Sequence, residues 1–160
     1  LSKEIWNKIG AESDASFIAP RYGIPISHGG FLANMRDMIR FGLLFTPSYK
    51  KVSEEKIISD DHIDLILTKG NPKLMQNLYQ KIPSANMPDD LRHNIYQWDA
   101  VYENGDFFKG GWAGQGLLIN PTRDIVAVWT GYKRDSEHDA REMRMIVREV
   151  LNTVYGETPE

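Results

Sequence analysis

Cysteine is absent from this 160-residue sequence. Its absence excludes disulfide bonds, zinc sites built on thiolates and cysteine nucleophiles. It leaves the compartment open, because cytosolic and exported proteins can both lack cysteine. The sequence also has no apolar run approaching the length of about 18 residues that indicates a membrane-spanning helix.

An excess of basic charge is also lacking, because 19 Lys and Arg face 22 Asp and Glu, for a formal net charge of −3. General nucleic-acid binders usually carry a basic stripe, so we predict no nucleic-acid partner. Hydrophobic residues make up 41%, with four Trp, seven Tyr and six Phe. That composition predicts a folded core of about one domain's length.

The start of the chain shows neither an initiator methionine nor a signal-peptide pattern, because it opens Leu1-Ser2-Lys3-Glu4. We therefore interpret the chain as a processed product or an excised fragment.

Helical periodicity dominates residues 1–93. Asn34 is predicted to cap a helix running to about Phe45, with Asp37 favouring the positive end of that helix. The other elements expected in this region are helices over 2–9, 59–68 and 71–80, loops over 11–30 and 83–90, and a charged, solvated stretch over 50–56.

Strand-like periodicity replaces the helical pattern over residues 94–160. Asn104-Gly105 is a strong hairpin signal, and Asn120-Pro121 predicts a second turn. Strands are expected over 95–102, 107–111, 115–120 and 125–131, followed by a helix capped by Asp135 or Ser136. We predict an α+β fold in which these strands form one antiparallel meander and the terminal helix packs on one face. Residues 1–93 and 94–160 together are expected to form one partial domain.

Two groups of side chains could take part in chemistry, the histidines and the Ser-x-x-Lys matches, but we predict a functional role for neither. His28, His62, His93 and His138 share no metal-ligand spacing, so we predict no metal site. Two Ser-x-x-Lys matches, Ser48 with Lys51 and Ser53 with Lys56, fall in the charged stretch and are interpreted as chance matches.

Four glycines stand close together in the segment Gly110–Gly116. Glycine within strands often marks a bulge or a close approach of ligand to backbone. Two hypotheses follow: a tight hairpin that needs positive φ, or a segment at the sheet edge whose backbone amides face a substrate.

Three segments resemble serine hydrolases related to class C β-lactamases, in the branch that contains esterases, penicillin-binding-protein-like proteins and 6-aminohexanoate-dimer hydrolases. Gly29–Gly42 resembles their "GG…RD…RFG" stretch, Gly114–Val126 their "GQ…(D/N)P…DxVV" hairpin, and Ile5–Ala15 their "LW…LGA…DA" segment. The resemblance implies the C-terminal part of a β-lactamase/transpeptidase-like fold. The family's Ser-x-x-Lys nucleophile and its tyrosine motif would then lie upstream of this chain.

The activity implied by the resemblance is hydrolysis of a small-molecule ester or amide by acyl transfer, without metal or cofactor. The missing N-terminal half is the implied partner, and this chain alone is expected to be inactive. The resemblance also points to the periplasm or cell envelope. The alternatives are a non-catalytic module that binds a ligand or peptidoglycan, and a free-standing interaction module.

The family's third motif, Lys-Thr-Gly, corresponds to Lys109-Gly110-Gly111. The backbone N–H of Trp112 would then be an oxyanion donor, with Lys109, Gly110, Gly111 and Gln115 as substrate contacts. An alternative register places Trp112-Ala113-Gly114 on the motif and makes Gln115 the donor. Gly110 lacks the threonine hydroxyl that binds a substrate carboxylate, which argues against penicillin-type hydrolysis, and Lys109 is equally well interpreted as an exposed surface lysine.

The strand Ile125–Trp129 is apolar on both faces. In the family it pairs with a strand from the N-terminal half. We therefore expect an isolated chain to form a homo-oligomer or to bind that missing half.

Overall fold

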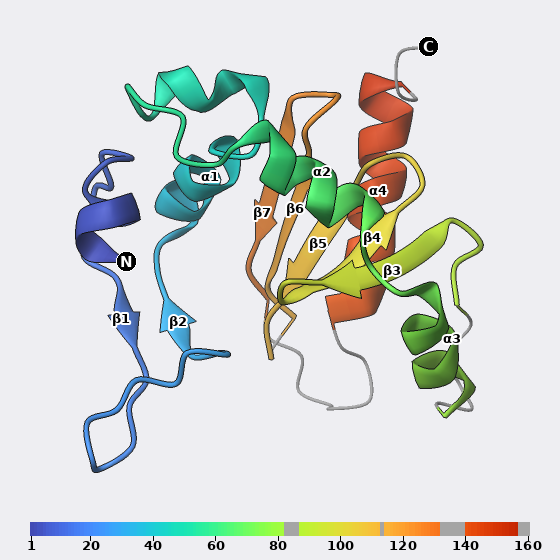
Figure 1. Cartoon of the computed structure of the whole chain (residues 1–160), viewed down its shortest axis with the longest axis horizontal. Coiled ribbons are helices and arrows are strands. Elements are labelled where there is room, and N and C mark those ends of the chain that lie inside the picture. Colours follow the sequence, from blue (N-terminus) through green and yellow to red (C-terminus); the bar gives the residue numbers. More distant parts are fainter. Residues whose placement is uncertain (82–86, 113, 132–139, 157–160) are drawn as a thin grey trace.

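A five-stranded antiparallel sheet forms the centre of the computed structural model, which describes residues 1–81, 87–112, 114–131 and 140–156. Its strands follow one another in chain order, as the sequence predicted (Figure 1). They are β3 (Leu91–Ile95), β4 (Trp98–Tyr102), β5 (Phe107–Gly110), β6 (Gly116–Asn120) and β7 (Ile125–Trp129). The α+β class and the meander are therefore confirmed.

The helices begin where the sequence places capping side chains. Asn34 accepts a hydrogen bond from Asp37 N, and Ser59 accepts one from His62 N. The predicted cap of the terminal helix lies outside the described residues. The helical elements are η1 (Ser2–Trp6), α1 (Met35–Leu43), η2 (Pro47–Lys51), α2 (Asp60–Thr68), α3 (Pro72–Gln80) and α4 (Ala140–Tyr155). Across the described ranges, no helix has the length and apolar character needed to cross a membrane.

The sheet separates two hydrophobic cores because successive strand side chains point to opposite faces. Phe107 and Leu117 belong to the core beneath η1, α1 and α2. Their neighbours Phe108 and Leu118 belong to the core shared with α3 and α4. Helices thus cover both faces (Figure 1).

The β7 strand lies at one edge of the sheet, as the family resemblance implied. It pairs with β6, and no other described strand borders it. Helix α1 packs on one face of β7 through Gly42, where a Cβ would lie 2.5 Å from Val126 Cγ1. The close approach explains why a glycine stands within this helix.

The predicted single strand over 95–102 is wrong, because the chain reverses at Tyr96 and Gln97. Both residues have positive φ, 48° and 68°, and join β3 to β4. Such two-residue turns favour Asn-Gly or Asp-Gly, and this pair contains neither. The sequence signal for the turn was therefore missing.

Three expectations for the N-terminal region also need correction. The loop predicted over 11–30 contains β1 (Ser16–Phe17), which pairs with β2 (Phe31–Leu32). The first helix is shorter than predicted and ends at Trp6. The stretch predicted to be solvated includes part of η2 and the buried Ser53, which is 5% exposed.

Candidate functional site

The segment that resembles the third family motif lies at the end of β5. Gly110 pairs with Gly116 across the β5–β6 hairpin, and Gly111 N donates to Gln115 O at 2.9 Å. Gly114 has φ +98°, so the hairpin uses the conformational freedom of glycine as the first hypothesis requires. The tight hairpin and a substrate-facing backbone are compatible, since Gly111 and Trp112 remain exposed.

Trp112 stands at this tip with a side chain that is 98% exposed. Within the described part of the chain, no acceptor takes a hydrogen bond from its backbone N–H. A free backbone donor at a strand end can stabilise negative charge that develops on a substrate oxygen.

Lys109 is held by Asp99, a residue that the sequence analysis did not identify. Lys109 Nζ lies 2.7 Å from Asp99 Oδ1, and Gly110 N donates to Asp99 Oδ2 at 2.8 Å. Asp99 comes from β4, and only the pairing of β4 with β5 places it there. The carboxylate balances the charge of Lys109, so this lysine is a weaker ligand for a substrate carboxylate than a free one.

Gln115 lies against the backbone of Gly111. A Cβ at Gly111 would approach Gln115 Oε1 to 2.9 Å, a contact that the flexible glutamine side chain can relieve by moving. The structure thus brings Lys109, Gly110, Gly111, Trp112 and Gln115 together at one end of the sheet. The two registers for the oxyanion donor, Trp112 and Gln115, both remain predictions.

A hollow of about 210 Å³ lies at the same end of the sheet. The residues Asn94–Asp99 line it, so the unexpected β3–β4 turn forms its wall. Asp99 belongs both to this wall and to the cluster with Lys109.

Neither Ser-x-x-Lys match is arranged as a nucleophile with its base. Ser48 Oγ donates to Asp124 Oδ2 at 2.6 Å, and Ser53 Oγ donates to Glu55 O at 2.9 Å. Lys56 forms an ion pair with Asp60. These contacts support the interpretation as chance matches.

Ser48 instead joins η2 to the β6–β7 turn. Burial would raise the pKa of Asp124, but hydrogen bonds from Ser48 and Thr46 lower it below its ordinary value. The carboxylate therefore stays charged and holds the turn, which is a structural role.

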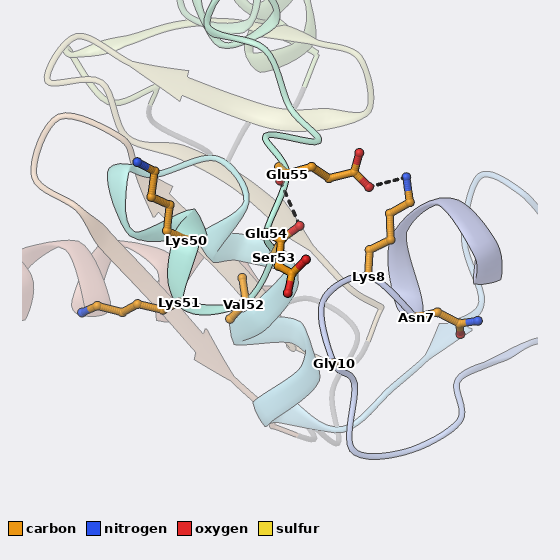
Figure 2. Close-up of a pocket in the computed structure, with 9 residues that line it drawn as sticks. All are labelled: Asn7, Lys8, Gly10, Lys50, Lys51, Val52, Ser53, Glu54 and Glu55. Carbon is orange, nitrogen blue, oxygen red and sulfur yellow. Dashed lines mark hydrogen bonds and ion pairs between the residues drawn. The ribbon is translucent and has the colours of Figure 1, made fainter.

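A larger groove of about 520 Å³ lies between the N-terminal segment and η2 (Figure 2). Lys8 Nζ lies 2.6 Å from Glu55 Oε1 across it, while Lys50 and Lys51 lie on the opposite side. The Lys8–Glu55 pair balances its own charge, and the groove brings no nucleophile to a base. We assign it no catalytic role.

One of the four histidines, His93, is packed in the core. His93 is 4% exposed, and its Nε2 lies 2.9 Å from Ile66 O. Gly70 packs against the same ring, which fixes it in the core. Among the residues that the structure describes, no group of three or more histidine or carboxylate side chains is placed to hold a metal ion.

Comparison of the sequence with the models of known protein families finds no family that matches it.

Proposed function

We propose that this chain supplies the substrate-binding edge and one oxyanion donor of a serine hydrolase related to class C β-lactamases. The observation that carries the proposal is the backbone N–H of Trp112, which donates to no described residue and follows Lys109-Gly110-Gly111 at an exposed strand end. The nucleophilic serine, its lysine and the tyrosine would come from sequence upstream of Leu1.

The proposed reaction transfers an acyl group from an ester or amide. The serine oxygen adds to the carbonyl carbon, and its proton passes to the lysine–tyrosine pair. The carbonyl oxygen becomes negative and accepts a hydrogen bond from Trp112 N–H. The alcohol or amine leaves with a proton, and water then hydrolyses the seryl ester. Loss of one such oxyanion donor typically lowers the rate by about 10²–10³-fold.

The edge strand β7 is the proposed contact with the N-terminal half. Its outer backbone groups are unpaired within the described chain, and exposed edges of this kind pair readily with another strand. We therefore expect self-association of the isolated chain in sedimentation experiments at micromolar concentration. A monomer with no affinity for the separately expressed upstream segment would contradict this part of the proposal.

The decisive test extends the chain with the upstream sequence and measures turnover of a chromogenic ester. Trp112→Pro should lower kcat strongly, because proline has no backbone N–H, whereas Trp112→Phe should have a mild effect. Circular dichroism must first show that the proline variant is folded. Near-normal kcat in a folded Trp112→Pro enzyme would exclude Trp112 as the donor.

The present chain provides a second test, because Ser48 and Ser53 have no positioned base. We expect no covalent labelling of either serine by a fluorophosphonate or penicillin probe, as mapped by mass spectrometry. Labelling at either position would show that a chance motif is reactive after all.

A non-catalytic binding module is the second candidate. The observation that favours it is the fully exposed Trp112 beside a lysine whose charge Asp99 already balances. An upstream sequence without a helix-opening Ser-x-x-Lys motif would decide for this candidate, which also includes a free-standing interaction module.

A further inference from the structure

We propose that the end of the sheet formed by the β3–β4 turn and the β5–β6 hairpin binds a neutral carbohydrate. The site is the hollow lined by Asn94–Asp99, and the exposed Trp112 stands on the β5–β6 hairpin at the same end of the sheet. Its volume of about 210 Å³ admits a group the size of one sugar ring. The proposal is independent of the proposed hydrolysis.

Strand pairing places the two aromatic residues at the same end of the sheet. In the β4–β5 pair, Ala100 lies opposite Phe108, and the Gly110 N–H reaches the Asp99 carboxylate. If this antiparallel register is continued toward the start of β4, the β3–β4 turn lies beside the residues that follow Gly110. Tyr96 and Trp112 therefore lie at the same end of neighbouring strands, although 16 positions separate them in the sequence.

The exposure of Trp112 is exceptional within this molecule. It is 98% exposed, whereas Trp6, Trp98 and Trp129 are each at most 9% exposed. Tyr96 is 57% exposed, and its ring lies beside that of His62, with the ring centroids 5.2 Å apart. Large aromatic side chains in water at one place typically mark a binding surface.

The backbone of the turn adds a second observation. Tyr96 and Gln97 both occupy the left-handed region, which is unfavourable for residues of this size. Such strain persists where particular side chains are needed, and it clusters at functional sites. Asn-Gly would make this turn without strain but would remove the tyrosine ring from the surface.

The polar groups of the hollow match hydroxyl groups. The side-chain amides of Asn94 and Gln97 make no hydrogen bond to any described residue, and each offers both donors and an acceptor. Asp99 and Lys109 balance each other, so the cluster carries no net charge. These features favour a neutral polyhydroxylated ligand over an anion.

The aromatic rings match the remaining surface of such a ligand. The face of an aromatic ring is electron-rich. The axial C–H groups of a pyranose form a flat patch of slight positive charge, so the sugar can stack on an indole or phenol while its hydroxyls bond to amides. An apolar ester would gain no hydrogen bond from the exposed amides of Asn94 and Gln97, whereas sugar hydroxyls would bind to both.

Fluorescence titration of the whole chain with chitotetraose and cellotetraose tests the proposal. Trp112 is the one exposed tryptophan in the described chain, so a stacked sugar should shift its emission to shorter wavelength in a saturable manner. We expect at least tenfold weaker binding by calorimetry in Trp112→Ala and in Tyr96→Ala. Tyr22→Ala is the matched control, because Tyr22 is 78% exposed and belongs to the β1–β2 segment; its affinity should be unchanged.

Three outcomes would overturn the proposal. One is the absence of saturable binding of either sugar, and another is sugar binding that Trp112→Ala leaves intact. The third is a Trp112 response to phenyl butyrate without a response to sugar, which would indicate an apolar surface instead. Ester turnover by the extended chain is measured separately and neither requires nor excludes sugar binding, so failure here and failure of the proposed hydrolysis are distinguishable.

Discussion

Two buried charged groups, one on each side of the sheet, are held in different ways. Asp37 in α1 is completely buried and accepts hydrogen bonds from the backbone of Glu12 at 2.8 Å and of Ser13 at 3.1 Å. Asn34 Nδ2 donates to it at 2.7 Å and Arg40 Nη1 at 3.1 Å. Two of its four partners thus lie within three residues in the sequence.

Arg148 in α4 is the counterpart on the opposite face, and its partners are distant in sequence. Its Nε lies 2.9 Å from Asp106 Oδ2, and its Nη2 lies 2.5 Å from Asp90 Oδ2. The guanidinium carbon also stands 3.5 Å from the centroid of the Tyr102 ring. Burial would lower the pKa of Arg148, but the hydrogen bonds to both carboxylates raise it, so the side chain stays charged.

Two of the partners of Asp37 lie close to it in the sequence, whereas the carboxylate partners of Arg148 lie far from it. Asp37 secures the start of one helix against a neighbouring loop, so its loss should loosen that corner of the molecule. Arg148 joins α4 to the region before β3 and to the region before β5. Its loss should weaken the packing of the whole helix on the sheet.

The largest effect is expected for Arg148→Met. This change leaves Asp106, which is 2% exposed, without its cation, and breaking a buried pair costs about 3–5 kcal/mol of unfolding free energy. Urea denaturation measures the loss. The matched control is Lys56→Met, whose partner Asp60 is exposed, with an expected loss of at most about 1 kcal/mol. Equal losses in the two variants would show that Arg148 contributes no more than a surface ion pair.

A smaller loss is expected for Asp37→Asn. The amide places an NH₂ group where the carboxylate accepts hydrogen bonds, and replacing a charged acceptor costs about 2–3 kcal/mol. Glu12→Gln is the control, because that side chain meets Arg40 at the surface. Hydrogen exchange should show local opening near residues 11–13 and 34–40 in Asp37→Asn, whereas opening throughout α4 would contradict the local role.

The stabilisation by Asp37 should also depend on pH. Burial raises its pKa, but the hydrogen bonds from Glu12, Ser13 and Asn34 outweigh that effect and hold the pKa below its ordinary value of 3.8. A depressed pKa in the folded state means that this stabilisation is fully present above pH 3.8 and is lost as the pH falls through the folded value. The difference in unfolding free energy between wild type and Asp37→Asn should therefore shrink as the pH is lowered below about 4. A difference that is constant between pH 7 and pH 3 would argue against a charged Asp37.

The smallest effect is expected for Ser48→Ala. Ser48 and Asp124 lie 76 positions apart, yet their contact is exposed. If burial rather than sequence separation determines the energy of this contact, Ser48→Ala should lower the free energy of unfolding by about 1 kcal/mol or less. Nuclear magnetic resonance should show the Asp124 pKa rising toward its ordinary value in the variant. A loss as large as that of Arg148→Met would mean that joining distant segments matters more than burial.

The helix starts at Asn34 and Ser59 and the hairpin at Asn104-Gly105 could be predicted from the sequence, because a capping side chain or a turn dipeptide acts on backbone within a few residues. The apolar strand Ile125–Trp129 was predicted for a related reason, because a continuous apolar run is a property of the strand alone. Its position at the edge of the sheet was implied only by the family resemblance. The glycine cluster near Trp112 indicated the candidate site, because glycine affects the conformation and accessibility of the backbone where it stands.

The reversal at Tyr96 and Gln97 was decided by tertiary structure, since these residues carry no turn signal and adopt positive φ only within the sheet. Asp99 reaches Lys109 because β4 pairs with β5, a relation that spacing along the chain does not encode. The carboxylates of Asp90 and Asp106 meet Arg148 through contacts spanning 58 and 42 positions. A local sequence pattern determines a local conformation. Which oppositely charged side chains meet across strands and helices depends on how the whole chain packs.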